Sequence, residues 1–191
     1  METDLLLPIT NYQLAITHYP LPIMKKIVIG VMGPGANATP SDLETARELG
    51  KLIAQEGWVL LTGGRNVGVM DAASIGAKSA NGLTVGILPS SDTSNVSDAV
   101  DIAIVTDMGN ARNNINVLSS DVVIACGMGA GTASEIALAI KGNKPVILLN
   151  CDEKSEAFFR SLSKNVAIAS TPQAAIQIAR AILSDRHQVQ G

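Results

Sequence analysis

Aromatic side chains are scarce in this sequence, which holds one tryptophan, two tyrosines and two phenylalanines among 191 residues. Proteins that bind single-stranded nucleic acid commonly stack the bases on aromatic rings, so this mode of binding is not expected. Cationic side chains are also few, because 14 Lys and Arg stand against 17 Asp and Glu, and no basic run is longer than Lys25-Lys26. We therefore expect neither a nucleic acid nor an anionic membrane as the main partner, although backbone amides can form a local anion pocket without changing the net charge.

Histidine and cysteine are equally rare. The histidines are His18 and His187, near the two ends of the sequence, so a metal centre or catalytic triad built on histidine is not expected. Cys126 and Cys151 show neither metal-ligand spacing nor a disulfide framework. We expect both to be buried, reduced thiols, and we expect no tightly held metal ligated by the protein. Cys126 could also touch a ligand, because it precedes a glycine-rich turn.

Long hydrophobic runs are missing as well. No run reaches the ~20 residues needed to span a bilayer, and no signal-peptide pattern is present. We therefore predict a cytoplasmic protein without a membrane partner. The overall composition is nevertheless apolar, at 47% hydrophobic and 16% charged residues, so the chain can bury a substantial core.

The first 23 residues differ in kind from the rest. Leucine, isoleucine, threonine and tyrosine recur there at intervals of seven, but three prolines oppose a stable helix. No comparable change of composition follows Met24. We predict a poorly ordered, repeat-like arm over 1–23, a single Rossmann-like domain over 24–183 and a polar tail over 184–191.

Apolar runs of strand length alternate with helical segments from residue 26 onward. The runs are continuous, which is typical of strands in a parallel sheet that is covered on both faces. The predicted strands cover 26–31, 58–61, 83–88, 102–105, 122–125, 144–150 and 166–169. The predicted helices cover 40–55, a segment that follows the turn at 62–70 and ends near Ala80, 106–118, 132–141, 155–162 and 171–183. This order predicts an α/β fold, a Rossmann-like doubly wound parallel sheet with helices on both faces.

The stretch 120–141 is the first candidate site. A buried strand leads into a turn with Gly127, Gly129 and Gly131, and we expect Thr132 to open the helix that follows. Glycines let backbone N–H groups approach a phosphate, and the positive end of the helix dipole faces it. A generic connection in an α/β fold is the alternative interpretation of this turn taken alone.

A second glycine turn, at 62–70, follows the strand over 58–61. Gly63, Gly64 and Gly68 again place flexible backbone at the carboxyl end of a strand, where ligands bind in open α/β sheets. Neither turn has the spacing of a dinucleotide fingerprint, and no P-loop lysine is present. The polar loop over 89–99 could cover the site as a flap or be an inert surface loop.

Two charged side chains accompany these turns. Arg112 is expected in the first turn of the helix over 106–118, the unfavourable end of the dipole for a cation, so either a bound anion or a surface carboxylate should compensate it. Glu135 has capping-box spacing from Thr132, so a structural capping role competes with a functional one. Ser41 and Glu44 have the same spacing and are expected to cap the helix that begins at Pro40.

The residues from 24 to about 149 resemble the superfamily that includes the cytokinin-activating phosphoribohydrolases, often labelled possible lysine decarboxylases. The resemblance rests on TGGRNVGVMDAASIGAK at 62–78, GNARNNINVLSSD at 109–121 and GMGAGTASE at 127–135. Within the superfamily, GLTVGILP at 82–89 followed by ARNNINVLSSDVVIACG is most similar to the bacterial and algal molybdenum cofactor carrier proteins. The enzymes carry a PGGxGTxxE motif, and this sequence keeps its Gly-Thr and glutamate but lacks its proline and one of its paired glycines.

Similarity to the carriers implies a homo-oligomer, a tetramer or a dimer, that binds molybdenum cofactor, protects it and transfers it to apo-molybdoenzymes such as nitrate reductase. The cofactor is a pyranopterin with a terminal phosphate, so anion-binding amides and amide side chains suit it. The expected binding residues are Gly63, Gly64, Gly68, Arg112, Asn113, Asn116, Gly127, Met128, Gly129, Ala130, Gly131, Thr132 and Glu135.

Two other functions remain open at this point. Similarity to the phosphoribohydrolases implies cleavage of a nucleoside 5′-monophosphate to its base and ribose 5-phosphate, with Arg112 and Glu135 as the catalytic residues. A nucleotide-sensing domain that binds without turnover is the third possibility. Lysine decarboxylation is disfavoured, because no lysine stands where a Schiff base to pyridoxal phosphate is suggested.

Overall fold

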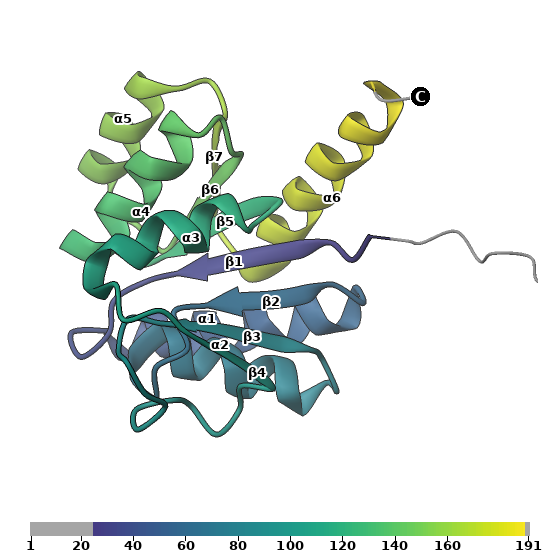
Figure 1. Cartoon of the computed structure of the whole chain (residues 1–191). Coiled ribbons are helices and arrows are strands. Elements are labelled where there is room, and N and C mark those ends of the chain that lie inside the picture. Colours follow the sequence, from purple (N-terminus) through teal and green to yellow (C-terminus); the bar gives the residue numbers. More distant parts are fainter. Residues whose placement is uncertain (1–24, 190–191) are drawn as a thin grey trace, which may run out of the picture.

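The computed structural model describes residues 25–189, together with the side chains of 25–185. The arm expected over 1–23 therefore lies outside the described residues. Strands and helices alternate along the described chain (Figure 1). The strands are β1 (Val28–Met32), β2 (Val59–Thr62), β3 (Thr84–Leu88), β4 (Ile102–Val105), β5 (Val122–Cys126), β6 (Val146–Leu149) and β7 (Val166–Ala169). The helices are α1 (Pro40–Gln55), α2 (Gly68–Ser79), the 3-10 helix η1 (Gly109–Arg112), α3 (Asn113–Leu118), α4 (Ala130–Lys141), α5 (Glu153–Leu162) and α6 (Pro172–Val189).

The strands form one seven-stranded sheet in the order β4-β3-β2-β1-β5-β6-β7, and every neighbouring pair is parallel. The chain builds outward from β1 to one edge and then returns to build outward from β5 to the other. The strand order therefore reverses between β1 and β5, where Met32 pairs with Ala125 at the carboxyl ends. In open α/β sheets this switch point is where a crevice for ligands forms.

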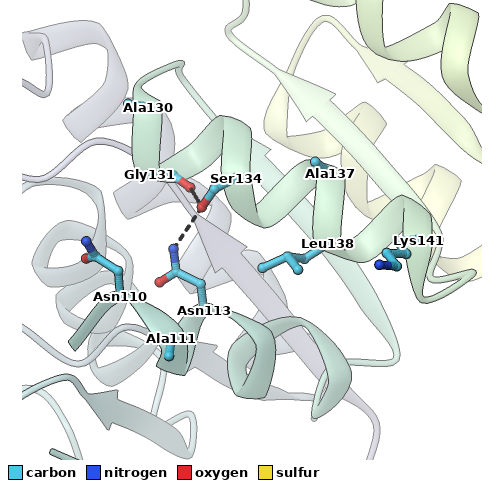
Figure 2. A pocket seen from close by; sticks show the side chains of 9 residues that line it. All are labelled: Asn110, Ala111, Asn113, Ala130, Gly131, Ser134, Ala137, Leu138 and Lys141. Atoms are coloured by element: carbon cyan, nitrogen blue, oxygen red, sulfur yellow. Dashed lines mark hydrogen bonds between the residues drawn. The ribbon is translucent and has the colours of Figure 1, made fainter. Parts of the chain in front are cut away.

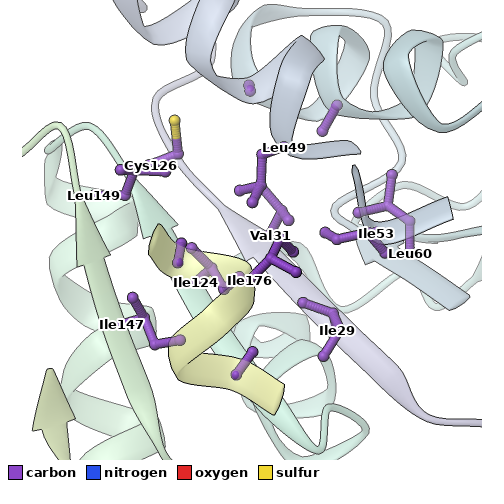
Figure 3. Packing of buried hydrophobic residues seen from close by; sticks show 14 of the residues in the cluster. Ile29, Val31, Leu49, Ile53, Leu60, Ile124, Cys126, Ile147, Leu149 and Ile176 are labelled. Atoms are coloured by element: carbon purple, nitrogen blue, oxygen red, sulfur yellow. The ribbon is translucent and has the colours of Figure 1, made fainter. Parts of the chain in front are cut away.

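Two apolar clusters, one on each face, hold the helices to the sheet. Along β5, Val122, Ile124 and Cys126 pack into the cluster beneath α1, α2 and α6, part of which Figure 3 shows. The alternate residues Val123 and Ala125 pack into the cluster on the opposite face, with α3, α4 and α5. This alternation follows from the period of a strand, which points successive side chains to opposite faces. The predicted Rossmann-like fold with helices on both faces is confirmed.

The ends of two helices differ from the prediction. At the start of α1, Thr39 and Asp42 form the capping box, so the prediction of Ser41 and Glu44 was wrong, although Pro40 does occupy the first turn. The sequence signal was present, because Thr39-Pro40-Ser41-Asp42 has the same spacing two residues earlier. At the other end of the chain, α6 runs to Val189 rather than ending near Leu183. No helix among residues 25–189 is long and apolar enough to cross a membrane.

Candidate functional site

The carboxyl ends of β1 and β5 meet at the switch point. Asp42 connects the loops that follow the strands there. The carboxylate of this buried residue accepts hydrogen bonds from the Thr39 backbone N–H at 2.9 Å and from the Asn150 side-chain amide at 2.6 Å. It also borders Gly127, whose φ is +75°, and a Cβ at Gly127 would lie 2.7 Å from Asp42 Cγ. Asp42 thus joins the start of α1 to the turn after β5 and to the residue after β6. Sequence reasoning did not single it out.

The turn after β5 leaves the start of α4 open. Helix α4 begins at Ala130, with Gly129 as an N-cap that offers no side-chain hydrogen bond. A Cβ added at Gly131 would meet no atom within 4 Å, and one at Gly129 would make only ordinary contacts. The first N–H groups of a helix have no partner within the helix and carry partial positive charge, so they bind anions well. This turn therefore offers amides and space together.

Thr132 and Glu135 do not form a capping box. The prediction that Thr132 opens the helix was wrong, because Thr132 lies inside α4 as its third residue. Its buried Oγ1 has no hydrogen-bond partner among the described residues. The Glu135 carboxylate instead accepts a hydrogen bond from the Asn116 side-chain amide at 3.0 Å, across the gap between α3 and α4. The structural capping role considered for Glu135 is therefore excluded.

Glu135 lies in a site that disfavours its charged form. The residue is only 7% exposed. Burial raises the pKa of its carboxyl group, while the hydrogen bond from Asn116 and the positive charge of Arg112 act in the opposite direction. A carboxyl group in this setting holds a proton more readily than a surface glutamate does.

Arg112 is buried, so the alternative of a surface arginine paired with a carboxylate is wrong. It ends η1 and precedes α3, because the helix expected over 106–118 is divided into these two short pieces. Its Nη1 donates a hydrogen bond to the backbone carbonyl of Ile87 at the end of β3, and its buried Nε has no partner in the described chain. Burial lowers the pKa of Arg112, the charge of Glu135 raises it and the charge of Arg65 lowers it.

In the turn after β2, neighbouring backbone occupies the space in which side chains at Gly64 and Gly68 would lie. A Cβ at Gly64, where φ is +74°, would lie 2.8 Å from Gly86 Cα. Gly68 has φ of +63°, and a Cβ there would run into the backbone of the loop after β1, with Gly35 C at 2.7 Å. The next amide along α2, Val69 N–H, already donates to Pro34 O at 3.0 Å. The start of α2 is therefore covered by the β1–α1 loop.

The polar loop over 89–99 packs against this same turn. Asn66 N–H donates to Asn95 O, and Ser97 N–H donates to Gly64 O, each at 2.9 Å. Arg65 and Val96 form an isolated antiparallel bridge beside them. These contacts hold the loop along the β2–α2 turn.

A groove of about 790 Å³ runs along α4 from its open end (Figure 2). Asn113 is buried on its wall and donates from its side-chain amide to Ser134 Oγ at 2.9 Å, and Ser134 Oγ donates to Gly131 O at 2.8 Å. These bonds link α3 to the first turn of α4. The groove is lined by Asn110, Ala111, Asn113, Ala130, Gly131, Ser134, Ala137, Leu138 and Lys141.

The predicted site residues thus fall into three groups. Asn113, Ala130 and Gly131 share the groove, and Gly127, Met128, Gly129 and Thr132 belong to the same turn. Asn116 and Glu135 are hydrogen-bonded, and Arg112 borders Gly63 and lies near enough to Glu135 for its charge to affect the pKa of the arginine. Gly64 and Gly68 lie in the covered β2–α2 turn. Sequence reasoning missed Ser134 and Ile87, whose roles depend on the packing of separate elements.

No cluster of His, Cys, Asp or Glu that could hold a metal ion occurs among the described residues. Cys126 and Cys151 are free, and Cys126 is buried while Cys151 is partly buried. Burial raises the pKa of the Cys126 thiol to about 12 and that of Cys151 to about 11. Both are therefore protonated, weakly reactive thiols at neutral pH.

Solved structures of similar sequence exist. The chain is 68% identical to the molybdenum cofactor binding protein from the phototrophic bacterium Rippkaea orientalis, with a TM-score of 0.83 over 84% of this chain and 99% of that one. It is 52% identical to the molybdenum cofactor carrier protein from Chlamydomonas reinhardtii, with a TM-score of 0.80 over 84% and 99% of the two chains. A cytokinin riboside 5′-monophosphate phosphoribohydrolase from Mycobacterium tuberculosis is 36% identical over 96 residues, which are 49% of this chain and 51% of that protein.

These similarities confirm the resemblance that the sequence motifs indicated. One family model matches residues 26–176, a stretch that runs from just before β1 to the first turn of α6. The chain belongs to the SLOG cluster4 family.

Proposed function

We propose that the protein binds and carries molybdenum cofactor. The observation that carries this proposal is the 68% identity to a molybdenum cofactor binding protein over almost the whole of that protein. The open start of α4 supports it, because its amides suit the terminal phosphate of the cofactor. The adjacent groove, with the amide side chains of Asn110 and Asn113, suits the polar edge of a pterin.

In this arrangement the protein binds the cofactor without catalysing a reaction. The N–H groups at the start of α4 and the unpartnered Thr132 hydroxyl are available to the phosphate oxygens. The buried Arg112 contributes positive charge near the same edge of the sheet. Contacts of this kind are reversible, which a carrier requires if the cofactor is to leave again.

The test is to load the purified protein with isolated molybdenum cofactor, remove free cofactor by gel filtration and add apo-nitrate reductase. We expect pterin and molybdenum to elute with the protein and nitrate reductase activity to appear after mixing. Absence of both from the protein fraction would contradict binding. Retention without restored activity would contradict the proposed transfer to apo-molybdoenzymes and leave binding intact.

A nucleoside 5′-monophosphate phosphoribohydrolase is the second candidate, and one observation favours it. Arg112 and the buried Glu135 lie close enough for each to affect the other's pKa, as an acid and a substrate-binding cation would. Incubation with AMP followed by chromatography tests this activity. Free adenine and ribose 5-phosphate, produced by the native chain and not by the Glu135→Gln variant, would establish it.

We also propose that the protein forms a homo-oligomer, a tetramer or a dimer, in the cytoplasm. Ile102, Ile104 and Val105 of the edge strand β4, together with Met108, are each more than 40% exposed. An exposed apolar edge strand is a surface that proteins usually cover. Light scattering coupled to size-exclusion chromatography gives the mass directly, and a monomer at micromolar concentration would contradict this proposal.

A further inference from the structure

The guanidinium of Arg112 occupies the space in which any other residue at position 63 would place its side chain. A Cβ built on Gly63 would lie 2.7 Å from Arg112 Nη2, closer still to Nη1, and 2.6 Å from Met70 Sδ. Gly63 does not have a positive φ, so backbone conformation does not require glycine here. What requires glycine is the close approach of the Arg112 guanidinium, together with that of the Met70 sulfur.

Two features fix the position of the Arg112 guanidinium in the space beside Gly63, which is called its slot below. Nη1 donates to the carbonyl of Ile87 at the end of β3, which lies beside β2 in the sheet. The missing side chain at Gly63 lets the guanidinium pass the end of β2 to reach that carbonyl. The two strand ends together therefore fix where the positive charge lies.

The protein compensates the positive charge of the Arg112 guanidinium poorly. Among residues 25–189, Arg112 takes part in no ion pair within 4 Å, and its Nε is buried without a hydrogen-bond partner. Glu135 attracts it, but burial favours the neutral form of that carboxyl group, and Arg65 adds a second positive charge nearby. An unpaired buried cation is costly, and an anionic ligand reduces that cost.

We propose that Gly63 is a positioning residue for Arg112, and that by having no side chain it keeps the guanidinium where it attracts the anionic, phosphate-bearing part of the ligand. This inference rests on the proposed function for the identity of the ligand. It assigns to Gly63 a role distinct from donating its own amide, which is the role expected from the glycine turn alone.

A double-mutant cycle tests the proposal. The affinities for inorganic phosphate and for isolated molybdenum cofactor are measured by titration calorimetry for the native chain, Gly63→Ala, Arg112→Ala and the double variant. Gly63→Ala should fold, because the atoms it meets are the ends of flexible side chains. We expect it to weaken phosphate binding about tenfold, as Arg112→Ala does, and the double variant to bind no more weakly than Arg112→Ala.

Two controls separate positioning from a general loss of structure. Gly142→Ala makes the same substitution at the far end of α4, where the nearest obstacle is the flexible Leu118 side chain at 3.2 Å, and it should bind phosphate as the native chain does. Methylguanidinium should restore phosphate binding to Arg112→Ala, whose slot is vacant, and not to the double variant, whose slot holds a methyl group. If Arg112→Ala does not fold, Arg112→Lys replaces it in the cycle.

Native affinity in Gly63→Ala, or a double variant whose loss equals the product of the two single losses, would overturn the role of Gly63. Either result with the cofactor still bound by the native chain leaves the proposed function standing. Conversely, if the native chain binds phosphate but not the cofactor, the proposed function fails while the phosphate cycle still decides the role of Gly63.

Discussion

The two glycine turns look alike in sequence and differ in space. After β2, a Cβ at each of Gly63, Gly64 and Gly68 would collide with an atom less than 3 Å away. After β5, Gly129 and Gly131 face ordinary contacts or open space. The first turn uses all three glycines for close packing, whereas the second does so only at Gly127, beside Asp42, and leaves Gly129 and Gly131 uncovered at the start of a helix. A glycine turn alone therefore does not identify an anion site, and the space around it is what distinguishes the two.

The largest expected effect is on stability in the covered turn. Gly68→Ala should lower the free energy of unfolding by about 3 kcal/mol or more, because it combines a positive φ with a collision against the backbone of the β1–α1 loop. Urea unfolding followed by circular dichroism measures this. A loss below about 1 kcal/mol would mean that the two turns differ less in packing than the structure indicates.

The matching substitution in the open turn should act on binding instead. Gly131→Ala places a methyl group in empty space in the first turn of α4, so the free energy of unfolding should be unchanged or rise by up to about 1 kcal/mol. Phosphate affinity should fall about tenfold, because the methyl group occupies the approach to the amides. Titration calorimetry and urea unfolding on the same preparation separate the two effects. Native affinity in this variant would argue against the open turn as the anion site.

Glu135, one turn further along α4, should make stability depend on pH. Burial raises its folded pKa above the unfolded value, so its stabilising contribution is complete below the unfolded pKa and is lost as pH rises through the folded pKa. Glu135→Gln keeps an acceptor for Asn116 and does not titrate. Relative to the native chain, the variant's free energy of unfolding, measured by urea unfolding, should rise as the pH increases from the unfolded pKa of glutamate through the folded pKa of Glu135. A constant difference between the two proteins would show that the carboxyl group is not perturbed.

The smallest effect is expected at Thr132. Its hydroxyl has no partner, so Thr132→Val should change the free energy of unfolding by less than about 0.5 kcal/mol. Thr39→Val is the matched control, because Thr39 Oγ1 accepts the Asp42 N–H at 3.1 Å and its loss should cost about 1 kcal/mol. Equal losses in the two variants would restore the capping role that the structure denies to Thr132.

Local sequence patterns predicted the elements of this fold well. Continuous apolar runs indicated the buried parallel strands, because both faces of β5 and β6 pack against helices. Helix ends were harder to predict, because several overlapping residue spacings can each form a cap. At the start of α1 the capping carboxylate of Asp42 also accepts a hydrogen bond from Asn150, a residue more than a hundred positions away that no local spacing contains.

The site was only partly predictable for the same reason. The amides at Gly129 to Thr132 depend on one strand and one helix, which a local pattern contains. The position of Arg112 depends on the Ile87 carbonyl and on the space at Gly63, and these come from two other strands. The contrast between the glycine turns likewise depends on the β1–α1 loop, whose Pro34 carbonyl accepts a hydrogen bond from the Val69 N–H.

Backbone amide chemical shifts during a phosphate titration compare the two turns most directly. With the isotope-labelled native chain, the amides of Gly129 to Thr132 should shift progressively and saturate, while those of Gly64 and Gly68 should move little. The reverse pattern, with the largest shifts at Gly64 and Gly68 and none at the start of α4, would contradict the assignment of the open turn as the anion site.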